Sequence, residues 1–231
     1  MLGDVVDEHV VDTVHVTREE RHRWPAPKPD AVFVDLPRVC AALKSLDWDK
    51  DEFLKRDMTD LARVWADRLA VESENRFFTA YFRWLDGDDS AANEVRRQAK
   101  ETARRLKTLA HILELHTDFS VCDTYDRLNA VKKIAYPGFS SVLVDNIVNF
   151  YCTSHQAELA TSCYIPAFEA YAADILAKIA KGERTALPDE EIIRGFRKRA
   201  IETPLEKIRS TMPRTRTNFN RALDELASCC P

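Results

Sequence analysis

The segment EVRRQAKETARRLKTLAHILELH, residues Glu94–His116, decides the fold. Its apolar positions recur at alternating intervals of four and three residues, which places them on one face of an α-helix. This apolar row consists of Val95, Ala99, Thr102, Leu106, Leu109, Leu113 and His116. The run is short for a self-standing coiled coil. We therefore expect a helix inside a bundle, with a dimer seam as the alternative.

Two stripes of the same helical period precede this segment. One stripe runs from Leu54 to Leu69, and an aromatic one from Phe77 to Leu85, which we assign to a separate helix packed in the core. The chain has only five glycines, which argues against a turn-rich all-β protein. The sequence predicts an all-α, single-domain bundle of about eight to nine helices.

Residues 1–36 have a different character. The stretch WPAPKPDAVFVDLP holds four prolines, and proline favours extended backbone at and before its own position. We predict an extended N-terminal arm over residues 1–36, followed by the helical domain at 37–231. The arm carries Trp24 and Phe33, large side chains that we expect to dock on the body or on a neighbouring subunit. The protein is therefore expected to form a homo-oligomer through its arm.

Bulk properties exclude several classes of protein. A net charge of −4 creates no overall field that would attract nucleic acid, so any polyanion site must be local. No run of apolar residues is long enough for a membrane span, and MLGDVVDEHVVD lacks the basic start of a signal peptide. The six cysteines show no C-x-x-C spacing. We expect free thiols in a reducing, cytoplasmic compartment.

A second row of residues on the segment Glu94–His116 is basic. Between Glu94 and His111, six Arg and Lys face two Glu, and five cationic or titratable residues share one helix face. This central basic row consists of Arg97, Lys100, Arg104, Lys107 and His111. Rows of this kind either solvate a helix and pair with nearby acids, or bind phosphate or an acidic protein surface.

The C-terminal basic segment, Ile192–Arg221, holds nine Arg and Lys against two Glu. In it, Arg214 and Arg216 bracket Thr215, whose hydroxyl can also donate to phosphate. If the two basic regions meet in space, they form one anion-binding surface. The residues assigned to it are Arg97, Lys100, Arg104, Lys107, Arg197, Lys198, Arg214, Arg216 and Arg221.

A rival hypothesis places an enzyme centre inside the bundle. His111 and Glu114 are three residues apart, as are His155 and Glu158, and Cys152 precedes His155 by the same spacing. Such pairs can ligate a metal or activate a thiolate. The order is His-x-x-Glu rather than the usual Glu-x-x-His, and no glycine-rich turn supplies an oxyanion site. We expect neither a metal nor a cofactor.

The function expected from the sequence is a non-enzymatic binding or assembly protein. It would hold nucleic acid or an acidic protein on its basic helices, as a nucleoprotein or coat-like subunit does. The alternatives are the helical-bundle enzyme just described and a regulatory domain of a larger complex with no ligand of its own.

Overall fold

The computed structural model describes residues 35–48, 51–132, 138–149, 156–184, 190–210, 212 and 218–230. Within these ranges the chain forms helices and no strand, which confirms the all-α prediction. The predicted arm, with Trp24 and Phe33, lies outside the described residues except for its last two positions. Of these, Leu36 is buried and begins helix α2 (Leu36–Lys44).

Two long antiparallel helices, α3 (Glu52–Leu85) and α4 (Ala91–Leu113), form the centre of the molecule. Asp51 caps α3, since its side chain accepts hydrogen bonds from the amides of Phe53 and Leu54. The two stripes that the sequence assigned to separate helices belong to this one helix, which corrects that prediction. Residues 54–85 contain neither Gly nor Pro, so nothing in the backbone interrupts the helix.

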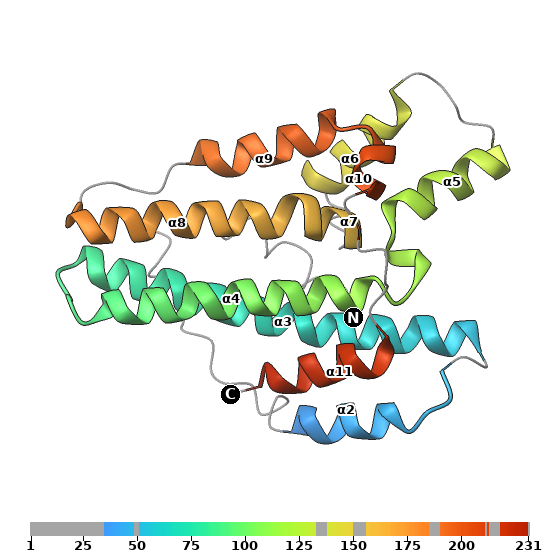
Figure 1. Cartoon of the computed structure of the whole chain (residues 1–231), viewed down its shortest axis with the longest axis horizontal. Coiled ribbons are helices and arrows are strands. Elements are labelled where there is room, and N and C mark those ends of the chain that lie inside the picture. Colours follow the sequence, from blue (N-terminus) through green and yellow to red (C-terminus); the bar gives the residue numbers. More distant parts are fainter. Residues whose placement is uncertain are drawn as a thin grey trace, which may run out of the picture.

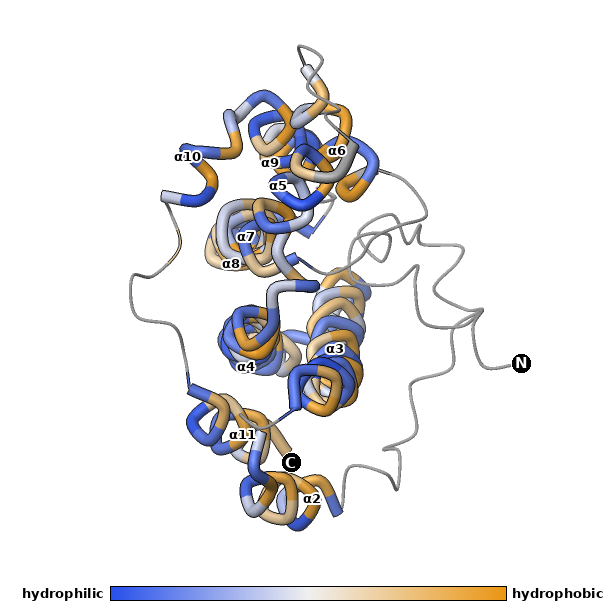
Figure 2. The backbone as a smooth tube through the Cα atoms, turned by 90° about the vertical axis from the view of Figure 1, so that its right-hand side faces the viewer, coloured by the Kyte–Doolittle hydropathy of each residue, from blue (hydrophilic) through white to orange (hydrophobic). Residues whose placement is uncertain are grey.

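The remaining helices form layers on both sides of this pair (Figure 1). On one side lies α8 (Ile165–Lys181), preceded by the short α7 (Ala157–Leu159) and a π-helical turn at Ala160–Tyr164, and beyond it lie α9 (Glu190–Glu202) and α6 (Phe139–Asn149). On the other side lies α11 (Phe219–Ser228), which packs against α2. A view along the helices shows α3 and α4 side by side between these layers (Figure 2).

Three short elements close one end of the bundle. A 3₁₀ turn, Thr117–Phe119, follows α4 and leads into α5 (Val121–Lys132), and α10 (Leu205–Ser210) follows α9. Pro204 stands just before α10 and Gly182 ends α8 in the left-handed conformation, with φ 73°. The sequence predicted both of these boundaries.

The apolar row of the segment Glu94–His116 is buried in the monomer. All seven of its residues are buried, and α4 packs against α3, α8 and α11. Phe77 is fully buried and meets Phe168 of α8 edge to face, with ring centroids 5.5 Å apart. The interpretation of α4 as an internal bundle helix, and of the aromatic stripe as core, is therefore confirmed.

Candidate functional site

The central basic row lies on the exposed side of α4, where most of its members are held by acids or carbonyls. Arg97 binds Glu94 one turn earlier at 2.6 Å. Arg104 binds Glu101 at 2.7 Å and also donates to the backbone carbonyl oxygen of Ser228 at 3.2 Å. The row is therefore largely neutralised by contacts inside the protein.

The last two members of the row make contacts between helices. Lys107 Nζ lies 2.7 Å from Glu169 Oε1 on α8. His111 Nδ1 lies 2.6 Å from Glu225 Oε2 on α11. Lys100 differs from its neighbours, because it is exposed and has no ion-pair partner among the described residues. With Arg104, three of these five side chains thus tie α4 to the layers on either side.

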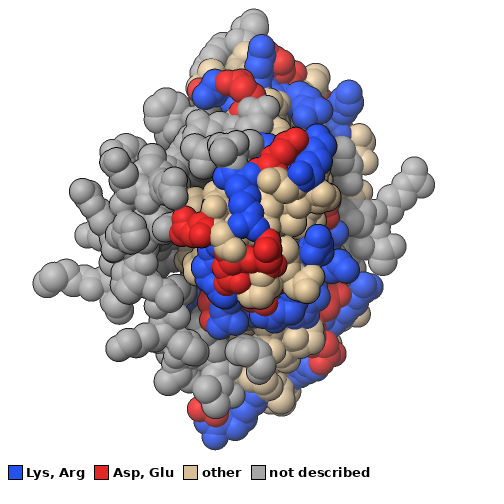
Figure 3. Space-filling view, turned by 90° about the vertical axis from the view of Figure 1, so that its left-hand side faces the viewer, with Lys and Arg blue, Asp and Glu red and all other residues tan. Residues whose placement is uncertain are grey.

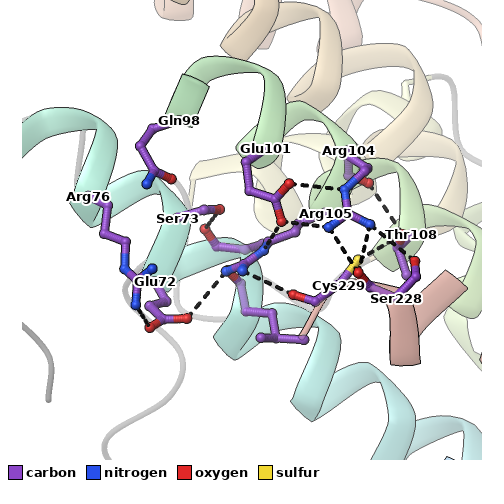
Figure 4. A network of polar contacts seen from close by, with 12 residues as sticks. Glu72, Ser73, Arg76, Gln98, Glu101, Arg104, Arg105, Thr108, Ser228 and Cys229 are labelled. Atoms are coloured by element: carbon purple, nitrogen blue, oxygen red, sulfur yellow. Dashed lines mark hydrogen bonds and ion pairs between the residues drawn. The ribbon is translucent and has the colours of Figure 1, made fainter. Parts of the chain in front are cut away.

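Arg105, which the row does not include, is the most constrained cation on α4. Its guanidinium is buried and donates to the Leu69 carbonyl oxygen at 2.6 Å and to Glu101 at 2.7 Å (Figure 4). It also lies 3.3 Å from Glu72 Oε2 and donates to the Cys229 carbonyl oxygen at 3.0 Å. Arg105 therefore joins α3, α4 and the end of α11 in one polar network.

Glu101 of this network is held in the charged form. Burial opposes the ionisation of Glu101, but hydrogen bonds from Arg104 and Arg105 hold the pKa of this carboxyl below its usual value. In the sequence, the i,i+4 spacing of Glu101 and Arg105 was the available signal for this pair. The burial of this pair depends on how α11 packs against α4, and the periodicity of α4 alone does not show that packing.

The cations of the C-terminal basic segment differ from those of the central basic row in the groups that they contact. On α9, the side chain of Lys198 is 74% exposed and its contact to Glu202, one turn later on the same helix, is 3.9 Å long. Arg194 is 66% exposed and pairs with Glu191, also on α9. Arg199 is exposed, and its guanidinium lies over the ring of Phe196 at 4.3 Å. These partners belong to the same helix, so the cations face solvent.

The predicted anion-binding residues are distributed over several layers. Arg197 and Lys198 lie on α9, and α8 packs between α9 and α4, which carries Arg97 to Lys107 (Figure 1). Arg221 lies on α11 and binds Glu225 at 3.0 Å. Arg214 and Arg216 are outside the described residues. On the face shown in Figure 3, blue and red side chains alternate and no large field of one sign is visible.

A cavity of about 570 Å³ lies at the end of the bundle where α4 stops. Its walls come from the end of α4, the start of α5, α7 and α10. Its titratable and hydroxyl side chains include Glu114, His116, Ser120, Asp123, Glu158 and Arg209. Cavities of about 300–1,000 Å³ with a few convergent polar groups are the usual form of a small-molecule site.

Most polar groups of the cavity wall have an assigned partner. The Glu158 carboxylate accepts hydrogen bonds from the Val121 amide at 3.0 Å and from the Cys122 amide, so it caps α5. Arg209 binds Asp126 at 2.7 Å, and this hydrogen bond raises the pKa of the guanidinium. His116 Nδ1 accepts from the Asp118 amide at 3.1 Å, so this nitrogen carries no proton.

The thiol in this wall is not activated. Burial, together with the charge of Glu158, raises the pKa of Cys122 to about 11. The cavity nevertheless brings together Glu114 and Glu158, two residues of the enzyme hypothesis, whereas His111 turns to α11 and Cys152 and His155 are outside the described residues. Among the residues with assigned structure, no three His, Cys, Asp or Glu side chains are grouped as metal ligands.

The described helices include none with the length and apolar character needed to cross a membrane. Comparison of the chain with protein-family models, with curated proteins and with solved structures found no significant match.

Proposed function

We propose that this protein is a non-enzymatic binding protein that holds a phosphate-bearing polyanion on α9 and α10. The observation that carries the proposal is the difference between the two basic regions. Lys107 and His111 on α4 bind carboxylates of other helices, whereas the partners of the exposed cations Arg194 and Lys198 among the described residues lie on α9 itself. Between Glu191 and Ser210, six Arg and Lys face three Glu.

The local pairs on α9 are weak competitors for a ligand. Exposed i,i+3 and i,i+4 ion pairs contribute about 0.3–0.5 kcal/mol each, and salt screens them. A phosphate that replaces Glu191 at Arg194, or Glu202 at Lys198, therefore displaces little binding energy. Lys207 on α10 is exposed and adds a further positive charge to the same segment. This surface is accordingly available to a polyanion without any rearrangement of the core.

The central basic row has a secondary role in this proposal. Arg104 and Lys107 hold α11 and α8 in place, so a ligand that claimed them would break contacts between helices. Lys100 remains available on α4. The planar, two-pronged donors of arginine suit the phosphates of nucleic acid and the carboxylates of an acidic protein alike, and nucleic acid is the partner that the experiment below tests. Self-association through residues 1–36 would then arrange several such surfaces along one strand.

A salt titration of oligonucleotide binding tests the proposal. A short fluorescein-labelled oligonucleotide is titrated with the full chain at a series of salt concentrations, and anisotropy gives the affinity. A nucleic-acid ligand requires the logarithm of the affinity to fall linearly with the logarithm of the salt concentration, by about 0.7–0.9 for each phosphate contacted. Absence of binding at low salt, or an affinity insensitive to salt, would overturn the proposal and favour an acidic protein partner.

A further inference from the structure

Gly195 lies in the middle of the exposed face of α9. Its neighbours on this face, at intervals of three and four residues, are Glu191, Lys198 and Arg199, and Arg194 precedes it directly. All four of these residues are exposed. A position without a side chain is thus bordered by three cations and one acid.

The helix itself does not require a glycine at this position. The φ of Gly195 is not in the left-handed region, and no described atom would lie within 4 Å of a Cβ placed there. Glycine inside a helix is destabilising relative to alanine, but it lets a ligand approach the backbone closely. The gap at Gly195 is therefore a place where a flat ligand group can reach the surface of α9.

The guanidinium of Arg199 provides a flat surface beside this gap. It lies over the ring of Phe196, 4.3 Å from the ring centroid, and its Nε donates a long hydrogen bond of 3.4 Å to the Gly195 carbonyl oxygen. The side chain thus folds back along the helix toward Gly195. No carboxylate among the described residues pairs with Arg199. One face of the guanidinium is covered by Phe196, and the side chain is otherwise exposed.

We propose that the polyanion is single-stranded nucleic acid and that one unpaired base stacks on the Arg199 guanidinium above Gly195. This inference rests on the proposed function of α9 and α10. Unpaired bases stack on guanidinium planes and aromatic rings, and this contact tolerates any sequence because every base has a π face. Arg194 and Lys198, on either side of Gly195 in the sequence, then contact the phosphates next to the stacked base.

The stacking contact distinguishes a single strand from the other polyanions. In a duplex, neighbouring base pairs cover both faces of each base, so a duplex offers α9 its phosphates but no free base. An acidic protein offers carboxylates, which bind the N–H edge of a guanidinium and not its face. The face of Arg199 that lies away from Phe196 therefore matches an unpaired base best.

Fluorescence anisotropy with two labelled strands tests the inference on the full chain. One probe is a DNA strand of about 12 nucleotides, and the other is a strand of equal length made of abasic sites, which keeps the phosphates and lacks the bases. We expect the strand with bases to bind at least about fivefold more tightly than the abasic strand. Equal affinities would overturn the inference and leave the proposed function standing. Absence of binding to both strands would overturn the proposed function and the inference with it.

Two variants locate the stacked base. Arg199→Lys keeps the charge and removes the plane, and it should weaken binding of the strand with bases about fivefold or more while the abasic strand binds as before. Arg38→Lys, the same change at an exposed arginine on α2, is the matched control and should leave both affinities unchanged.

Gly195→Leu fills the gap and should weaken binding of the strand with bases to a similar degree. The same variant should raise the melting temperature, because leucine has a higher helix propensity than glycine, so unfolding would not explain the loss. Wild-type affinity for the strand with bases in either Arg199→Lys or Gly195→Leu would overturn the inference.

Discussion

The guanidinium of Arg105 lies 3.0 Å from the backbone carbonyl oxygen of Cys229, which fixes the end of α11 against α4 and α3. The neighbouring residue, Arg104, makes a similar contact to the Ser228 carbonyl oxygen but does so from the exposed surface. Two adjacent arginines thus bind carbonyl groups at the end of α11, Arg105 from inside the core and Arg104 from the exposed surface (Figure 4).

The two arginines should therefore differ in their effect on stability. Arg105→Leu removes the buried partner that Glu72 and Glu101 share and leaves these acids with only their more exposed partners, Arg76 and Arg104. We expect a loss of about 3 kcal/mol in the free energy of unfolding, the lower end of the cost of breaking a buried ion pair. Arg104→Leu removes an exposed pair and should cost about 1 kcal/mol or less. Urea denaturation followed by circular dichroism measures both. Equal losses in the two variants would contradict the distinction between them.

Glu74 gives a prediction about pH. Burial, together with the charge of Asp67 on the same helix, raises the pKa of Glu74 well above its ordinary value of 4.5. The folded state therefore binds this proton more tightly than the unfolded state, and Glu74 lowers stability as pH rises from the unfolded pKa toward the folded pKa. Glu74→Gln mimics the protonated acid and abolishes this dependence.

The measurement is the free energy of unfolding of the wild type and of Glu74→Gln between about pH 5 and pH 8. The variant should gain stability relative to the wild type as pH increases. Glu94 serves as the matched control, because its pKa is shifted in the opposite direction. The hydrogen bond from Arg97 lowers the pKa of Glu94, and this effect outweighs the opposing effect of burial. The difference between the wild type and Glu94→Gln should not grow in the same direction. A constant difference for Glu74→Gln would show that Glu74 is ionised throughout.

The cysteines of the core should be unreactive in the native protein. Burial raises the pKa of Cys163 to about 12, with Arg197 and Arg199 opposing the shift, and burial also raises that of Cys40 to about 11. The thiolate is the nucleophile, so native alkylation near neutral pH should be slow at these residues and complete in denaturant. Mass spectrometry after iodoacetamide treatment resolves each site. Rapid native labelling of Cys122 would instead revive the thiolate hypothesis for the cavity.

Deletion of residues 1–30 tests the predicted role of the arm in assembly. We expect the shortened chain to form a smaller oligomer than the full chain, because Trp24 is removed from its docking surface. Light scattering coupled to size-exclusion chromatography gives the mass of each. A monomer before and after the deletion would contradict self-association through the arm.

The sequence predicted those parts of the fold that depend on local pattern. The alternating spacing of Val95 to Leu113 identified the buried face of α4, and Gly182 identified the end of α8. Helix α3 has no single apolar face, since Asp67, Ser73 and Glu74 are buried as well as its aromatic residues, and this explains why its two stripes resembled two helices. A helix at the centre of a bundle loses the amphipathic signal on which the prediction relied.

The candidate sites were harder to predict because they depend on partners from distant segments. The central basic row is a correct description of one helix face, yet Glu169 and Glu225, which bind two of its members, lie on α8 and α11. The cavity brings Glu114 and Glu158 together. In the sequence, the only signal for these residues was the spacing of Glu114 to His111 and of Glu158 to His155. Arg209 and Asp123 join them through the packing of α10 and α5, which periodicity within one helix cannot reveal.

Charge reversal on α9 and α10 tests the central claim most directly. Lys198→Glu/Lys207→Glu is compared with Arg38→Glu/Lys181→Glu, which changes the net charge equally at two sites whose side chains are 81% and 67% exposed on other helices. In the oligonucleotide anisotropy assay at about 0.1 M salt, the first variant should bind roughly 10- to 100-fold more weakly than the wild type, with a smaller salt slope, and the second should bind nearly as well. Equal losses in both variants would show that net charge alone governs binding and would contradict a polyanion site on α9 and α10.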